Sequence, residues 1–143
     1  LELDYDMAYT EHPLHAIELA EEAAQSGYDV VVAVGGDGTA NEVLNGVVQA
    51  NQKSSAKKTT MGLLPIGQGN DFAYGLGVPL NLENACQLLK ENKRREIDVG
   101  LVRGGQFPDG RYFGNSVGIG FDAVVGFVAL RNFYTVTLQL LLI

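Results

Sequence analysis

One segment constrains the fold of this chain more than any other. Residues 29–34 form an apolar, β-branched run that leads directly into Gly35-Gly36-Asp37-Gly38-Thr39. After this turn the spacing becomes helical, with an apolar stripe at Ala40, Val43, Leu44, Val47 and Val48. A strand, a glycine turn and a helix start therefore follow one another. This order points free backbone N–H groups and the positive end of a helix dipole at an anion.

The glycine turn has two interpretations. Glycines allow a phosphate to approach the backbone closely, so the turn is a candidate phosphate site. The alternative is a βα turn without a ligand, in which Asp37 or Thr39 caps the helix. The spacing matches neither Gly-x-x-x-x-Gly-Lys-Ser/Thr nor Gly-x-Gly-x-x-Gly, which excludes these two common phosphate loops.

A second glycine loop follows the next apolar run. Residues 61–64 are a short strand ended by Pro65, and residues 66–71 are the loop. Strands that alternate with helices predict an α/β fold, a Rossmann-like parallel sheet with helices on both faces. Ligands of such sheets bind at the carboxyl ends of the strands. Both glycine loops are therefore expected at the same edge, where they would share one ligand.

The other elements of the first two thirds are predicted from apolar spacing. Residues 1–10 are a strand, and the helix that opens at residues 10–13 ends at Gly27. The polar residues 51–60 are a surface loop. Asn81 is expected to cap the next helix. The buried faces of the two helices are predicted to be Leu14, Ile17, Ala20 and Ala24, and Leu82, Ala85, Cys86 and Leu89.

The last third changes from βα alternation to hairpin chemistry. Residues 95–103 are expected to be a strand with Ile97, Val99 and Leu101 inward, followed by a turn at 104–110 and a partner strand at 111–117. This change predicts a domain boundary near residue 98, between an α/β domain, 1–98, and the start of a β-rich domain, 99–143. Residues 136–143 resemble a strand without a later partner, which indicates missing segments near Leu130.

Composition limits the classes of function. A net charge of −7, from 17 acidic and 10 basic residues, argues against a nucleic-acid partner. Cys86 is the single cysteine and is interpreted as a small buried hydrophobe. His12 and His15 have no cysteine or carboxylate partner at ligand spacing by our reading, so we interpret them as surface residues. No apolar run approaches the ~18 residues of a membrane span.

The two glycine loops resemble those of a known enzyme superfamily. Gly35-Gly36-Asp37-Gly38-Thr39 with Asn41-Glu42 resembles the diacylglycerol, sphingosine and ceramide kinases. Residues 64–73, Leu-Pro-Ile-Gly-Gln-Gly-Asn-Asp-Phe-Ala, resemble the Pro-x-Gly-Thr-x-Asn-Asp-Phe-Ala loop of the same family. NAD kinases and phosphofructokinases have similar first loops, but the second loop favours the lipid kinases, especially the soluble bacterial enzymes. The resemblance covers roughly residues 8–125.

The resemblance implies an ATP-dependent lipid kinase that transfers the γ-phosphoryl of ATP to a lipid hydroxyl, from diacylglycerol to phosphatidic acid, with Mg²⁺. It implies that Asp37, Asp71 and Asp98 join a water and Mg²⁺ network, although Asp98 is equally well a strand-end carboxylate. Glu42 either contacts the nucleotide or interacts favourably with the positive end of a helix dipole. Thr10 either contacts the nucleotide or caps a helix. Gln68 replaces the usual threonine or serine. The implied ATP-binding set is Thr10, Gly35, Gly36, Asp37, Gly38, Thr39, Ala40, Asn41, Glu42, Gly67, Gln68, Gly69 and Asn70.

The resemblance also implies a lipid substrate at a membrane surface. We expect a cytoplasmic protein, with a peripheral position at the inner face of the membrane and a homodimer as compatible states. Nothing like the Asn-Pro-x-Ser-Gly segment of the family precedes Leu1, and we find no match to the general base of its β-rich domain. We therefore expect an incomplete chain. The alternatives are a soluble-substrate kinase of the NAD kinase type and a regulatory module that binds nucleotide without catalysis. Asp37→Ala is expected to abolish Mg·ATP binding and leave the fold intact.

Overall fold

The computed structural model describes residues 4–55, 58–105, 107–125 and 139–142. Residues 121–125 are helical. The other helices and strands, in chain order, are β1 (Asp6–Tyr9), α1 (His15–Gln25), β2 (Val30–Gly35), α2 (Asp37–Lys53), β3 (Thr60–Pro65), α3 (Asp71–Gly75), α4 (Leu82–Glu91), β4 (Gly100–Gly104), β5 (Phe107–Phe113) and β6 (Gln139–Leu142).

The main sheet has four strands in the order β1-β6-β2-β3. β2 and β3 are parallel, and β6 is antiparallel to both β1 and β2. β1, β2 and β3 therefore run in the same direction, which confirms the predicted α/β class with its parallel strands. The exception is β6. Its partners come from the first part of the chain, a long-range pairing that no local pattern indicates. The rest of the predicted strand, residues 136–138 and 143, lies outside the described residues.

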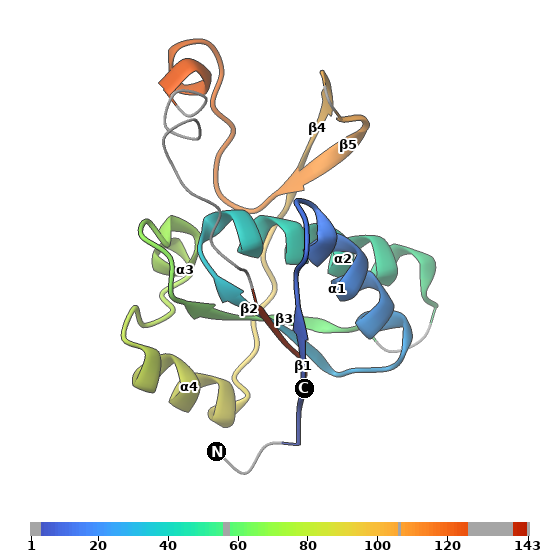
Figure 1. The fold of residues 1–143 in the computed structure, drawn as a ribbon, viewed down its shortest axis with the longest axis vertical. Coiled ribbons are helices and arrows are strands. Elements are labelled where there is room, and N and C mark those ends of the chain that lie inside the picture. The colour runs from blue at the N-terminus through green and yellow to red at the C-terminus, as the bar shows by residue number, and fades with distance from the viewer. Residues whose placement is uncertain (1–3, 56–57, 106, 126–138, 143) are drawn as a thin grey trace.

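Helices cover both faces of this sheet, as predicted (Figure 1). α1 and α2 pack on one face against Val31, Ala33 and Leu63. α4 covers the opposite face, where Ala85 packs against Val32 and Leu64. Within the described ranges, no helix combines the length and the apolar character that crossing a bilayer requires.

The buried stripe of α1 differs from the predicted one. Leu14 is exposed and adopts a left-handed backbone with φ 68°, so the helix begins after it, at His15. The buried positions are Ala16, Ala20 and Ala23. In α4, Asn81 is the N-cap as predicted, with its Oδ1 accepting from the Asn84 N–H at 3.1 Å.

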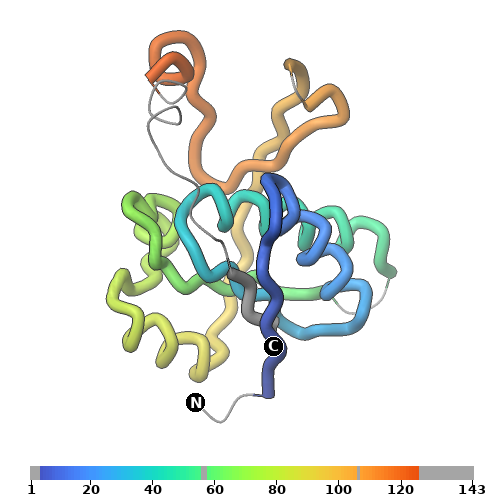
Figure 2. The backbone as a smooth tube through the Cα atoms, viewed as in Figure 1, coloured from blue at the N-terminus to red at the C-terminus, as the bar shows by residue number. Residues whose placement is uncertain are grey.

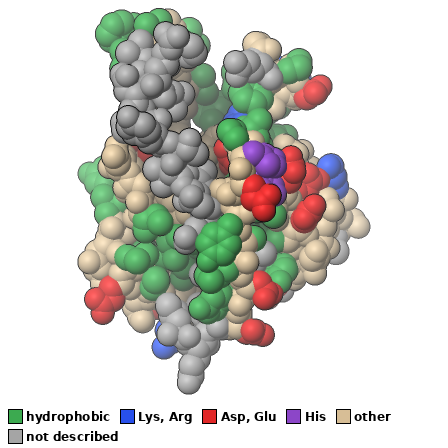
Figure 3. All heavy atoms as spheres, in the orientation of Figure 1, with side chains coloured by type: hydrophobic (Ala, Val, Ile, Leu, Met, Phe, Trp, Pro, Cys, Tyr) green, Lys and Arg blue, Asp and Glu red, His purple; other side chains and the backbone are tan. Residues whose placement is uncertain are grey.

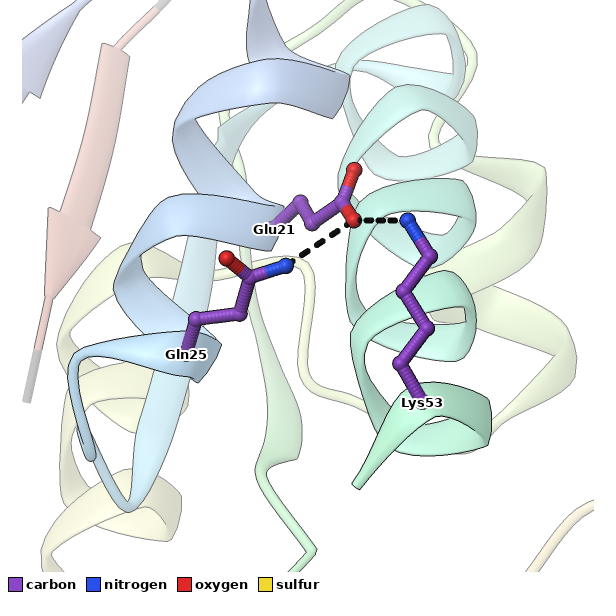
Figure 4. A network of polar contacts seen from close by, with 3 residues as sticks. All are labelled: Glu21, Gln25 and Lys53. Atoms are coloured by element: carbon purple, nitrogen blue, oxygen red, sulfur yellow. Dashed lines mark hydrogen bonds and ion pairs between the residues drawn. The ribbon is translucent and has the colours of Figure 1, made fainter.

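α1 and α2 cross at very short distance. A methyl group at Gly46 of α2 would lie 2.3 Å from the Ile17 carbonyl oxygen and 2.8 Å from Ala20 Cβ. At the rim of the crossing, the Lys53 ammonium lies 2.5 Å from Glu21 Oε1, which also accepts a hydrogen bond from Gln25 (Figure 4). Small residues therefore allow the helices to approach, and a polar network closes the outer edge.

The β4–β5 hairpin stands apart from the main sheet, beside residues 114–125 (Figure 2). The return strand begins at Phe107, four residues earlier than predicted, because Gly104 and Gly105 make the turn with φ 127° and 55°. Residues 95–99 are not a strand, which corrects the prediction for 95–103. Ile97, Val99 and Leu101 are 36–41% exposed instead of inward.

Candidate functional site

The two glycine loops lie against each other at the carboxyl edge of β2 and β3. Gly35 is paired with Pro65 in the sheet, and the Ile66 N–H donates to the Gly35 carbonyl at 3.1 Å. A methyl group at Gly67 would lie 2.4 Å from Gly36 Cα, so neither loop has room for a side chain at this contact. The predicted meeting of the loops at one edge is confirmed.

The amino end of α2 lies at this site and follows directly from the first glycine loop. Gly36 is the N-cap, and the first helical bond runs from the Ala40 N–H to the Gly36 carbonyl at 3.0 Å. The N–H groups of Asp37, Gly38 and Thr39 therefore have no acceptor within the helix. Gly38 is exposed, and nothing lies within 4 Å of where its Cβ would be. The 17-residue α2 thus presents its positive dipole end and the Gly38 backbone on an open surface, whereas Thr39 is buried.

Asp37 connects the two loops. Its Oδ2 accepts from the Asp71 N–H at 3.2 Å, and its Oδ1 accepts from the Phe72 N–H at 2.8 Å. The carboxylate therefore caps α3, not its own helix. The side chain therefore does not simply face solvent but holds the second loop to the first. That Asp37→Ala leaves the fold intact stays a prediction, and the substitution is expected to cost stability.

Asn70 shapes the second loop from within. Its Oδ1 accepts from the Gly67 N–H at 3.0 Å, and its Nδ2 donates to the Gly67 carbonyl at 2.7 Å. Asn70 has a left-handed backbone, with φ 61°, and is buried. This closed turn leaves Gln68 and Gly69 exposed at its tip, where a ligand can reach them.

Glu42 and Thr10 connect the site to α1 and β1. Glu42 accepts from the N–H groups of Leu14 and Ala16, both at 3.2 Å, so its carboxylate caps the start of α1. Of the two roles predicted for Glu42, this contact corresponds to the interaction with a helix dipole, but the helix is α1 and not α2, to which Glu42 belongs. Thr10 follows β1 directly. Tyr9 and Val34 are both paired with Gln139, which places Thr10 at the level of Gly35 and Pro65.

A row of amides on α2 holds the hairpin. Asn41 and Asn45 each donate to the Tyr112 carbonyl at 2.9 Å, and Asn45 accepts from the Tyr112 N–H at 2.8 Å. Asn45 is 2% exposed. Asn45 was not among the site residues predicted from the sequence. Its signal was a second asparagine four residues after Asn41, beside the apolar stripe of this helix.

Arg111 adds a charged contact beside this row. Its Nε donates to Asn41 Oδ1 at 2.7 Å, and its guanidinium lies 4.8 Å from the centre of the Phe107 ring. Burial lowers the pKa of Arg111, and the negative charge of Glu42 opposes this change. Asn41, Glu42 and Arg111 therefore lie together where the first glycine loop meets the hairpin.

Two of the three predicted metal-binding carboxylates lie near each other. A methyl group at Gly69 would lie 3.0 Å from Asp37 Oδ2 and 3.9 Å from Asp71 Oδ2. Asp98 is in the irregular segment 93–99 and does not join them in a cluster of close ligand atoms. Two carboxylates fit Mg²⁺, which keeps several waters and takes one or two protein oxygens beside phosphate. Bound there, Mg²⁺ would neutralise charge on phosphate oxygens.

The histidines differ from their predicted surroundings. His12, His15 and Glu18 place one ligand atom each within 4.8 Å of the others, so a carboxylate partner does exist at ligand spacing. The two imidazole rings stack with centroids 4.4 Å apart, on the surface that Figure 3 shows in purple beside acidic groups. His15 Nδ1 accepts from the Glu11 N–H at 3.1 Å.

Comparison with known proteins connects this geometry to a family. Residues 1–102 match the family described as the diacylglycerol kinase catalytic domain. A diacylglycerol kinase of Bacillus subtilis (strain 168) is 38% identical over 106 residues, covering 73% of this chain and 31% of that protein. A Chromohalobacter salexigens protein named "Probable lipid kinase YegS-like" is 38% identical over 109 residues, or 76% of this chain and 32% of that protein.

A solved structure agrees with these matches. The crystal structure of a diacylglycerol kinase from Bacillus anthracis str. Sterne has a TM-score of 0.58 and 27% identity, covering 81% of this chain and 38% of that chain. This chain thus spans about a third of the length of the curated relatives it matches. The chain belongs to the diacylglycerol kinase catalytic domain family.

Proposed function

We propose that this chain is the ATP-binding part of a lipid kinase that transfers the γ-phosphoryl group of ATP to a lipid hydroxyl, with diacylglycerol as the acceptor. The observation that carries the proposal is the contact of the two glycine loops in front of the amino end of α2. Phosphoryl transfer depends mainly on positioning and on neutralising phosphate charge, and backbone N–H donors at a rigid edge supply both.

The roles of individual residues follow from this arrangement. The N–H groups of Asp37 and Gly38 would bind phosphate oxygens, with the buried Thr39 behind them, and Gln68 and Gly69 would contact the nucleotide from the second loop. Asp37 and Asp71 would hold Mg²⁺ through their carboxylates, partly by way of water. Asn70 and Glu42 would act indirectly, since their side chains already bond the backbone of Gly67 and of α1.

Family membership supports a lipid acceptor, and the names of two relatives, diacylglycerol kinase and lipid kinase, point in the same direction. Diacylglycerol would reach the site from a membrane, so we propose a peripheral location at the inner face. The choice of diacylglycerol over other lipids, the use of Mg²⁺ and a homodimeric state belong to this proposal.

The test is ATP binding by calorimetry, with and without Mg²⁺, for matched glycine variants. Gly38→Val and Gly75→Val both place a β-branched side chain in open space on a helix, without a positive φ. Gly38 lies in the phosphate site and Gly75 at the end of α3. Gly38→Val is therefore expected to weaken ATP binding at least tenfold, whereas Gly75→Val leaves the affinity unchanged.

Equal ATP affinity in the two variants would remove the phosphate-binding argument, and so would the absence of ATP binding to the unmodified chain. The acceptor is tested by phosphorylation of diacylglycerol in mixed micelles compared with phosphorylation of NAD. Turnover of NAD alone would identify a soluble-substrate kinase. ATP binding without turnover of either acceptor would favour the regulatory module.

A further inference from the structure

A large groove lies outside the predicted ATP-binding residues, with Phe72 at the end of the second motif in its lining. It has a volume of about 760 Å³, within the range of about 300–1,000 Å³ that is typical of small-molecule sites. It follows β3, the last strand of the sheet, between α2, α4 and the irregular segment 93–99, which crosses from α4 to the hairpin in Figure 1. Its lining contains none of the predicted ATP-binding residues.

The walls of this groove are largely apolar, and one side of its lining is basic. Apolar side chains line it from α2, β3 and α4, including Val48, Met61 and Leu89. Ile97 and Val99 line it from the irregular segment. Lys90, Lys93, Arg94 and Arg95 also line it, so four of the ten basic residues of an acidic chain gather at one groove.

The two arginines keep their charge available. Arg94 donates to Asn92 Oδ1 at 2.9 Å and to Thr60 Oγ1 at 3.1 Å, and Arg95 donates to the Leu76 carbonyl. Among the described ion pairs, Lys93 is joined to Glu91 and neither arginine is joined to a carboxylate. Neutral acceptors thus orient both guanidinium groups without cancelling their charge, although the acidic Asp29 also lines the groove. Each guanidinium has five N–H donors, so several remain for a ligand.

We propose that this groove binds a lipid with one acyl chain and a phosphate monoester head group. The acyl chain would lie along the apolar wall of β3 and α4, and the phosphate would bind Arg94 and Arg95. Arginine pairs with phosphate through two parallel N–H bonds, which makes it the better of the two basic residue types for this head group. A neutral peptide strand on the free edge of β3 would leave this cluster of charge unmatched.

The experiment is calorimetric titration of the chain with three probes below their micellar concentrations: oleoyl lysophosphatidate, monoolein and glycerol 3-phosphate. The complete amphiphile is expected to bind at least tenfold more tightly than either part. Equal binding of monoolein would make the basic side chains irrelevant and overturn the proposal. Absence of lysophosphatidate binding would also overturn it.

Two pairs of variants locate the site. Arg94→Gln with Arg95→Gln is expected to weaken lysophosphatidate binding at least tenfold, while Arg103→Gln, on β4 outside the groove, leaves it unchanged. Val99→Asp places a charge on the groove wall. Val102→Asp is its control, because it places the same charge on the hairpin, outside the groove lining, at a similar exposure (36% for Val99 and 40% for Val102). Because residue 99 is in an irregular segment and Val102 is largely exposed on β4, both aspartate variants should fold.

Only Val99→Asp is expected to lose the lipid. Equal binding by Val99→Asp and Val102→Asp would overturn the assignment of the groove. A dimer that Val99→Asp converts to a monomer, with no lipid bound by either form, would instead identify the groove as an interface between copies. ATP affinity is measured separately, so failure of the lipid test and failure of the proposed kinase function are distinguishable.

Discussion

Asp37 and Glu42 each use both carboxylate oxygens to accept hydrogen bonds from backbone N–H groups at the start of another helix. Asp37 caps α3 from a position 34 residues earlier in the chain, and Glu42 caps α1 from a position 28 residues after Leu14. Capping by a side-chain oxygen is typically worth about 1 kcal/mol, and a negative charge at a helix start adds to it. Both residues therefore stabilise the fold whether or not nucleotide is bound.

This dual role gives a prediction for Asp37. Asp37→Ala removes the acceptor of the Asp71 and Phe72 N–H groups, so we expect a loss of about 1–2 kcal/mol in the free energy of unfolding. We also expect weaker Mg·ATP binding. The measurements are denaturant unfolding and calorimetry, with Asp71→Ala as the control. The described structure gives the Asp71 side chain no hydrogen bond, so its loss should affect Mg²⁺-dependent binding more than stability. Wild-type stability in Asp37→Ala would contradict the capping role.

At the residue level, the sequence predicted which residues gather at the site better than it predicted what they touch. The glycine loops were found from local spacing, because a strand, turn and helix start are encoded within a few residues. The partners of Asp37, Glu42 and Asn45 were not found, since each lies 26 to 67 residues away in the chain. The role of Asn45 depends on the position of the hairpin on α2, which the local sequence around Asn45 does not encode.

At the scale of the elements, the α1–α2 crossing depends more on the small size of the residues between the helices than on the ion pair at its rim. The Glu21–Lys53 pair and its Gln25 contact lie at the rim, with the Lys53 side chain 66% exposed. Exposed ion pairs contribute only about 0–1 kcal/mol. Gly46, in contrast, is buried where the other helix leaves no space for a methyl group.

Gly46→Ala is therefore expected to destabilise the chain by about 1–3 kcal/mol, despite the higher helix propensity of alanine, because overpacking forces the helices apart. Gly38→Ala is the matched control in the same helix, since its Cβ meets no atom within 4 Å. It should be neutral or slightly stabilising. Thermal unfolding of both variants decides the matter, and similar melting temperatures would show that the crossing relaxes at little cost.

The hairpin is attached to α2 through Asn45, and this attachment gives a second prediction for the elements. Asn45→Ala leaves the Tyr112 N–H without its acceptor, so we expect a loss of about 1–3 kcal/mol and looser docking of the hairpin. Gln52→Ala is the control, because Gln52 bonds only the Tyr112 hydroxyl at an exposed position. Hydrogen exchange at Tyr112 is the measurement. Unchanged protection in Asn45→Ala would show that the hairpin is held by other contacts.

For the whole molecule, the α/β class followed from alternating strand and helix signals, whereas the strand order did not. β2 and β3 pair directly, so their carboxyl ends share one edge, whereas β1 reaches the same edge because β6 lies between β1 and β2. A four-residue strand with three leucines carries no local information on its partners. Periodicity can therefore predict that such a strand exists, but neither its neighbours nor its direction.

The position of β6 can be tested through its backbone. Leu140 is paired with Ala8 on one side and Ala33 on the other, so β6 is an interior strand. Leu140→Pro removes an N–H from this ladder and places proline where interior strands do not tolerate it. We expect a loss of at least about 3 kcal/mol, with the exchange protection of β1 most affected, since β6 is its sole strand partner in the described sheet. Leu140→Val keeps the N–H and should retain both stability and protection. Equal behaviour of the two variants would show that β6 does not pair between β1 and β2, and would remove the register that places Thr10 level with Gly35.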